Sequence, residues 1–179
     1  MVYSVLTVYL ALTFLFSAIA KLRHMGSFVE VTQAYEVLSS PWDRIFACLL
    51  PFLEMGAVVF LLFRQTHVWG VWILVGLLSV FAWAVGSVIH SGRVITCGCY
   101  GKWMDAQADR FTLLKIASLG VVCMVLLGGQ ISGAGIDLRA LPLTSGAILF
   151  LLSLLAQKIW ISYQNSLARL RHPQKGERP

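Results

Sequence analysis

The sequence predicts an all-α fold, a polytopic membrane helical bundle with five transmembrane helices and one short interfacial helix. Hydrophobic residues make up 58% of the 179 residues and charged residues only 12%, and the mean hydropathy is +0.79. Several apolar runs reach the length of about 20 residues that a helix needs to cross a hydrocarbon core of ~30 Å. Such continuous runs exclude a β-barrel, whose strands alternate apolar and polar residues over ~10 positions.

Five runs are candidate spans: Val2–Ala20, Ile45–Phe63, Val68–Ile89, Phe111–Leu127 and Leu141–Trp160. We expect one transmembrane domain over residues 1–162 and a basic polar C-terminal tail over residues 163–179. The first run is interpreted as a retained anchor, because no Lys or Arg precedes Lys21 to form the basic region of a signal peptide. The net charge of +6 is interpreted as flanking charge of a membrane protein, with the lipid bilayer and no nucleic acid as partner.

The segment after the first run predicts a short interfacial helix. Ser27 and Glu30 have the spacing of a capping box, and Phe28, Val31, Tyr35 and Leu38 recur at helical spacing before Pro41. A connector on the membrane surface is the simpler interpretation, and a lid over a site is the alternative. Because successive spans alternate in direction, this helix and the polar segment after the third span are expected on one face, with many of the basic residues.

Two cysteines in that polar segment are the main candidates for chemistry. Cys97 and Cys99 flank Gly98 in a glycine-rich loop, where a free cysteine has no packing role. A disulfide closed across one residue is strained, and strained disulfides tend to be labile or catalytic. Nearby basic residues favour the nucleophilic thiolate. Cys48 is a candidate resolving cysteine or a small packed residue, and Cys123 is interpreted as packing.

Three ionisable residues complete the candidate site. Glu54 lies within the second span, three residues after Pro51, and intramembrane carboxylates usually face the bundle interior with a partner or a task. Lys115 lies one turn into the fourth span and either extends its ammonium group to the interface or pairs with Glu54. His90, seven residues before Cys97, is a candidate base or a solvated helix-end residue.

Three sequence elements together resemble the MauE family of methylamine-utilisation membrane proteins, which is distantly similar to the DoxX group. The resemblance is strongest over residues 2–128, and Tyr100 stands where the family leads us to expect Phe. The elements are Ser17-Ala18-Ile19-Ala20-Lys21-Leu22-Arg23, Leu50-Pro51-Phe52-Leu53-Glu54 and Cys97-Gly98-Cys99-Tyr100-Gly101.

The resemblance implies membrane thiol–disulfide exchange with a thioredoxin-like protein, in support of the maturation of methylamine dehydrogenase, a disulfide-rich exported protein. It also implies a bacterial cytoplasmic membrane. The layout is similar to that of quinone-linked disulfide-forming proteins, although their Cys-x-x-Cys pair is absent. A quinone near Glu54, Trp83 and Trp103 is therefore a candidate electron partner, and no cofactor follows from the sequence with certainty.

Two alternatives remain open from the sequence. Two thiolates also suit a soft metal such as Cu(I), Zn or Hg, with Cys48 and His90 as further ligands. A non-enzymatic assembly factor that uses its cysteines for anchoring is the other alternative. The oligomeric state does not follow from the sequence.

The distribution of charge predicts which side of the membrane the dithiol faces. The basic residues on the dithiol side are Lys21, Arg23, Arg44, Arg93, Lys102 and Arg110, joined by Arg169, Arg171, Lys175 and Arg178 of the tail. Since the opposite side carries only Arg64 and Arg139, the positive-inside rule predicts a cytoplasmic dithiol. Oxidation of exported proteins would instead require the dithiol outside, because the cytosol keeps thiols reduced.

Overall fold

The computed structural model describes residues 1–35, 42–91, 110–131 and 140–171, and these residues form six α-helices. They are α1 (Val2–Arg23), α2 (Met25–Ala34), α3 (Trp42–Leu62), α4 (His67–His90), α5 (Arg110–Ile131) and α6 (Ala140–Arg171). All except α2 are long and apolar enough to cross a membrane. The predicted all-α fold with five spans is therefore confirmed, and the protein is a multi-pass membrane protein.

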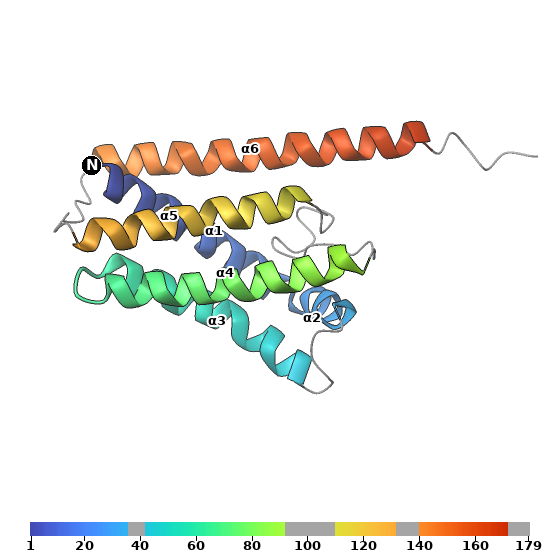
Figure 1. The fold of residues 1–179 in the computed structure, drawn as a ribbon, viewed down its shortest axis with the longest axis horizontal. Coiled ribbons are helices and arrows are strands. Elements are labelled where there is room, and N and C mark those ends of the chain that lie inside the picture. Colours follow the sequence, from blue (N-terminus) through green and yellow to red (C-terminus); the bar gives the residue numbers. More distant parts are fainter. Residues whose placement is uncertain (36–41, 92–109, 132–139, 172–179) are drawn as a thin grey trace, which may run out of the picture.

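Helix α1 is the central element of the bundle. It packs against α3, α5 and α6 and also touches α2, while α3 packs on α4 and α4 on α5. Four helices, α1, α3, α4 and α5, thus surround one core, and α6 lies outside against α1 (Figure 1). The core contains leucines with at most 1% of their surface exposed: Leu10, Leu50, Leu61, Leu74 and Leu126.

Small residues allow the helices to approach closely. A Cβ atom built on Gly70 of α4 would lie 2.6 Å from the backbone nitrogen of Leu61 in α3. A Cβ on Gly146 of α6 would lie 2.7 Å from Val8 in α1. Because lipid tails are as apolar as leucine, membrane helices associate mainly through such close packing and through interhelical hydrogen bonds.

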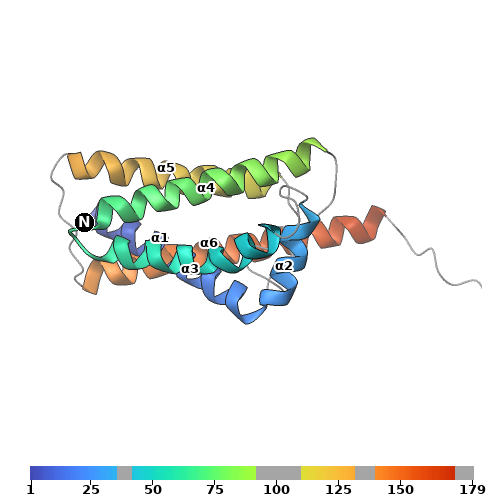
Figure 2. The same cartoon turned by 90° about the horizontal axis from the view of Figure 1, so that it is seen from below.

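The two ends of the bundle are built differently. At one end, the four residues Phe63–Thr66 join α3 to α4 directly. At the other end, α1 passes into α2, α4 ends at His90 and α5 begins at Arg110 (Figure 2). The second end, called here the α2 end, is therefore the one from which the chain continues into the cysteine segment.

Helix α2 starts differently from the sequence prediction. Only His24 separates it from α1, and the Phe28 N–H donates to the His24 carbonyl at 3.0 Å. Ser27 lies inside the helix, and His24 makes no side-chain capping bond, so the predicted capping box is wrong. Phe28 is buried against the bundle. Residues 36–41, including Leu38 and Pro41, lie outside the described residues.

Helix α6 is longer than predicted. It continues without a break through the expected boundary at residue 162 to Arg171. Most of its spanning stretch, Leu141–Gln164, is exposed on the outside of the bundle. This apolar surface is suited to contact with lipid.

Candidate functional site

Glu54 lies in the interior of the bundle, as the sequence predicted. It is in the middle of α3, with 0% of its surface exposed. Pro51, also buried, lies inside the same helix and has no N–H to donate to the carbonyl one turn earlier. A carboxylate at this depth requires a partner, because an unpaired charge in the bilayer is costly.

The partner of Glu54 is Lys21 of α1. The Lys21 Nζ donates a hydrogen bond to Glu54 Oε1, and the two groups form an ion pair. Each side chain is 1% exposed. Lys21 was expected among the flanking basic residues of the interface, and this expectation is wrong, because its side chain turns into the bundle.

Aromatic rings from two further helices contact the Lys21 ammonium group. Its Nζ lies 5.3 Å from the ring centre of Phe28 in α2 and 4.7 Å from that of Phe81 in α4. Both distances are within the range of a cation–π interaction. The site is thus built from four helices, and we refer to Lys21, Glu54, Phe28 and Phe81 as the buried charge cluster.

The two oxygens of the Glu54 carboxyl group are in different environments. Oε1 accepts from Lys21, whereas Oε2 is buried without a hydrogen-bond partner among the described residues. Ser17, one helical turn before Lys21 on α1, also interacts with this carboxyl group. Buried acceptors are nearly always satisfied in folded proteins, so an unsatisfied oxygen calls for an explanation.

Lys115 does not pair with Glu54. Its Nζ donates to Gln157 Oε1 at 2.7 Å, which links α5 to α6. Phe111 and Trp160 stack at the same end of these helices with ring centres 4.8 Å apart. The sequence alternative in which Lys115 pairs with Glu54 is therefore wrong, because Lys21 already occupies that position.

The remaining candidates divide into described and undescribed residues. Cys97, Cys99 and Trp103 lie outside the described residues, between the end of α4 and the start of α5. Cys48 is exposed on α3, so of its two alternatives the small packed residue is wrong, while the packing role predicted for Cys123 is confirmed by its full burial.

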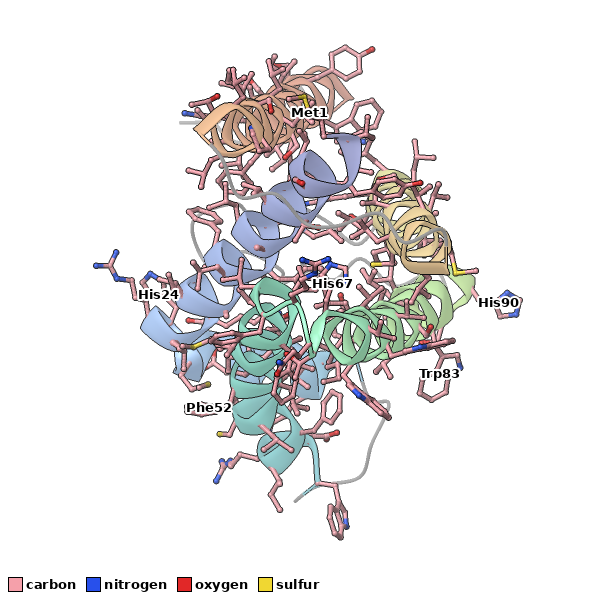
Figure 3. The ribbon with its side chains drawn as sticks, turned by 90° about the vertical axis from the view of Figure 1, so that its left-hand side faces the viewer. Met1, His24, Phe52, His67, Trp83 and His90 are labelled. Atoms are coloured by element: carbon pink, nitrogen blue, oxygen red, sulfur yellow. The ribbon has the colours of Figure 1, made fainter. Side chains whose placement is uncertain are left out.

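His90 and Trp83 point away from the buried charge cluster. His90 is exposed at the end of α4, and Trp83 is 63% exposed on the same helix (Figure 3). Trp83 thus lies on the outside of the bundle, whereas Glu54 is buried inside it. Among the described residues, no three His, Cys, Asp or Glu side chains gather into a metal-binding group.

A second buried polar contact lies at the opposite end of the bundle. His67, the first residue of α4, is 1% exposed, and its Nε2 lies 3.4 Å from Thr7 Oγ1 of α1. The Thr7 hydroxyl donates to the Tyr3 carbonyl at 2.8 Å. Since a hydroxyl has one hydrogen, it can only accept from His67, which assigns the proton to Nε2. Figure 3 shows His67 inside the bundle.

Lys21 is the residue of the buried charge cluster whose burial the sequence analysis missed. Lys21 continues the buried face of α1, whose members recur three and four residues apart: Ser4, Thr7, Ala11, Phe14, Ala18 and Lys21. This spacing is typical of the interior face of a helix. The sequence alone does not single out this face, because lipid and protein core are equally apolar, so the burial of Lys21 is seen only in the packed bundle.

The fold and site define a multi-pass α-helical membrane protein with a buried ion pair near the end that carries its cysteine segment. The family model described as methylamine utilisation protein MauE matches residues 1–129, and the chain belongs to this family. The match covers all of the buried charge cluster and both loop cysteines and stops before α6.

Three curated relatives carry the same description. The chain is 30% identical over 130 residues to the MauE protein of Paracoccus denitrificans, covering 72% of this chain and 70% of that protein. It is 26% identical over 160 residues to the protein of Methylophilus methylotrophus, covering 88% and 84%. It is 31% identical over 111 residues to the protein of Methylorubrum extorquens, covering 62% and 60%. No solved structure matches significantly.

Proposed function

We propose that this protein is a membrane thiol–disulfide redox protein in which Cys97 and Cys99 cycle between dithiol and disulfide. The observation that carries the proposal is the Cys97-Gly98-Cys99 sequence between two helix ends, His90 and Arg110, of a chain that has little other chemistry. Of the other two cysteines, Cys123 is buried in the core and is unavailable for exchange. The loop pair is therefore the best supported redox centre.

One exchange transfers two electrons and two protons from the thioredoxin-like partner to the loop cysteines. A thiolate of the reduced, thioredoxin-like partner attacks the Cys97–Cys99 disulfide and forms a mixed disulfide, which releases one loop cysteine as a thiolate. The partner's second thiolate then attacks the partner sulfur of the mixed disulfide. This step releases the other loop cysteine as a thiolate and leaves the partner oxidised. The loop dithiol is reoxidised by an acceptor, and a quinone, which dissolves in the same bilayer, is the acceptor class included in the proposal.

The biological task that we propose is support for the maturation of disulfide-containing exported proteins. Membership of a family whose relatives are described as methylamine utilisation proteins supports this task, and the bacterial cytoplasmic membrane is the proposed location. Exported substrates require the cysteine segment on the outer side, opposite to the side that the basic residues predict. Labelling of intact cells with a membrane-impermeant maleimide after mild reduction distinguishes these two orientations.

Trapping of mixed disulfides tests the redox proposal directly. In Cys97→Ser or Cys99→Ser the remaining loop thiolate attacks the disulfide of the oxidised partner, the reverse of the step above, and displaces one partner thiolate. No second loop thiol is present to complete the exchange, so we expect a covalent adduct with the partner that reductant releases. The matched control is Cys48→Ser, which leaves both loop cysteines in place and is expected to give no stable adduct. If neither loop cysteine changes redox state under oxidant or reductant, the proposal is wrong. Stoichiometric metal that disappears in the double variant would favour a metal-binding protein instead.

A further inference from the structure

Helix α2 covers the buried charge cluster with a single side chain. Phe28 is the only residue of α2 that is buried, and its ring lies against the Lys21 ammonium group. The neighbouring residues on this helix are exposed or partly exposed. Met25 and Val29 of the same helix pack, partly buried, against the core, and Phe28 is the α2 residue that contacts the Lys21 ammonium group.

The cover is attached through a short hinge. His24 is the one non-helical residue between α1 and α2, with φ −127° and ψ 45°. Rotation about this residue would lift α2 without disturbing the hydrogen bonds within either helix. The position of Lys21, two residues before the end of α1, places its long side chain within reach of the membrane interface.

The Glu54 carboxylate has a free position for a proton. Its Oε2 is buried with no hydrogen-bond partner among the described residues, whereas Oε1 is held by Lys21. An ion pair in a low-dielectric interior gains little unless its remaining lone pairs are satisfied, and apolar residues of similar size often serve stability equally well. The arrangement is therefore poorly explained by stability alone.

Protonation of Glu54 would have a direct structural consequence. The carboxylate takes one proton from water and becomes neutral, while Lys21 keeps its charge and loses its counter-ion. Two aromatic rings are weak compensation for a buried ammonium group, because a cation–π contact is much weaker than the interaction with a carboxylate counter-ion. Lys21 would then extend to the interface, and Phe28 would keep its apolar neighbours in the core but lose the ammonium group.

We propose that Glu54 is an exchangeable-proton site of the membrane bundle and that α2 is its cover, held closed by Lys21 and opened when Glu54 takes up a proton. Lys21 of α1 is the charged group that faces this carboxyl, Ser17 of α1 the neutral polar one. The elements α2 and α4 present Phe28 and Phe81 to the cluster. Asp43 is eleven residues earlier on α3, about 16 Å along the helix axis. The inference is independent of the cysteine chemistry.

Hydrogen–deuterium exchange of the full-length protein in lipid nanodiscs tests the cover. The variant Glu54→Gln imitates the protonated carboxyl group. We expect amide exchange in residues 25–34, corrected for intrinsic rates, to rise about tenfold, which corresponds to about 1.4 kcal/mol, while exchange in the middle of α4 is unchanged. The matched control Lys115→Met removes a lysine that contacts another helix and is expected to leave α2 unchanged. Unchanged exchange in α2 of Glu54→Gln would overturn the proposal.

A second variant separates the cover from the folding of the bundle. The double replacement Lys21→Met with Glu54→Leu keeps side chains of similar size and removes both charges. We expect it to fold, to keep α2 closed, and to lose the dependence of α2 exchange on pH that the unmodified protein shows. In the unmodified protein, an infrared band of a protonated carboxyl group that is absent from Glu54→Gln is expected as α2 opens. Opening of α2 with the same pH dependence in the double variant would contradict the proposal.

Discussion

The two ends of the bundle bury polar side chains of α1 through different interactions. At each end, α1 buries a polar side chain against a neighbouring helix: Lys21 meets Glu54 at the α2 end, and Thr7 meets His67 at the other. The second contact is a neutral hydrogen bond beside the four-residue turn and the close approach at Gly70. The first is an ion pair under a separate helix joined by one hinge residue. The charged contact lies at the end where a single non-helical residue, His24, joins α2 to α1.

The largest expected effect comes from removing one member of the ion pair. Lys21→Met leaves the Glu54 carboxyl group buried without its counter-ion, and Glu54→Leu leaves the ammonium group unpaired. Each single variant is expected to lower the free energy of unfolding by about 3–5 kcal/mol, whereas the double variant recovers most of this loss. Thermal unfolding in detergent or nanodiscs measures these differences. Equal losses in the single and double variants would show that packing volume, rather than charge, governs the α2 end.

An intermediate effect is expected from Gly70→Ala, near the end of the bundle where residues 63–66 join α3 to α4. The added Cβ would lie 2.6 Å from the Leu61 backbone nitrogen, and backbone cannot move aside as a side chain can. We expect a loss of about 1–3 kcal/mol, as is typical of overpacking. The matched control is Gly76→Ala on the same helix, where nothing lies within 4 Å and better helix propensity favours a small gain. Similar stability of the two variants would mean that this end is not closely packed.

The smallest expected effect comes from the hydrogen bond between Thr7 and His67. Thr7→Val keeps the shape of the side chain and removes the acceptor for His67 Nε2, with an expected loss of about 1 kcal/mol. Thr13→Val is the matched control, because Thr13 donates to the Tyr9 carbonyl of its own helix at 2.8 Å. Differential scanning calorimetry of both variants measures the two losses of stability. A loss as large as that of the ion-pair variants would remove the contrast between the two ends.

The spans could be predicted from the sequence because crossing a bilayer requires long apolar runs, which composition reveals directly. The interior and exterior faces could not be distinguished in the same way, since lipid and protein core are equally apolar. This explains why the sequence left packing open as one of two alternatives for Cys48, which is exposed, while Cys123 is buried as expected. Hydropathy patterns thus locate helices in the membrane without orienting them around their axes.

The ion pair illustrates a second limit. Glu54 stands out in the sequence because it interrupts an apolar run, but Lys21 stands at the end of one, where basic residues are common. Its partner is 33 positions away, and only the packing of α1 on α3 brings the two together. The start of α2 was also predicted wrongly. Ser27 and Glu30 have the spacing of a capping box, but the helix begins at Met25, directly after His24, so Ser27 lies inside it.

The length of α6 has a consequence for the shape of the protein outside the membrane. Thirty-two residues make a rod of about 48 Å, which still spans about 37 Å across the bilayer at a tilt of 40°, the steep end of the usual range. A hydrocarbon core of about 30 Å cannot contain it, so part of the rod stands in the aqueous or headgroup layer. Figure 1 shows it extending past the bundle at the α2 end. A reporter fused behind Arg171 would therefore lie outside the membrane on the side of the cysteine segment. One measurement with this reporter would show which side of the membrane both the C-terminal tail and the cysteine segment face.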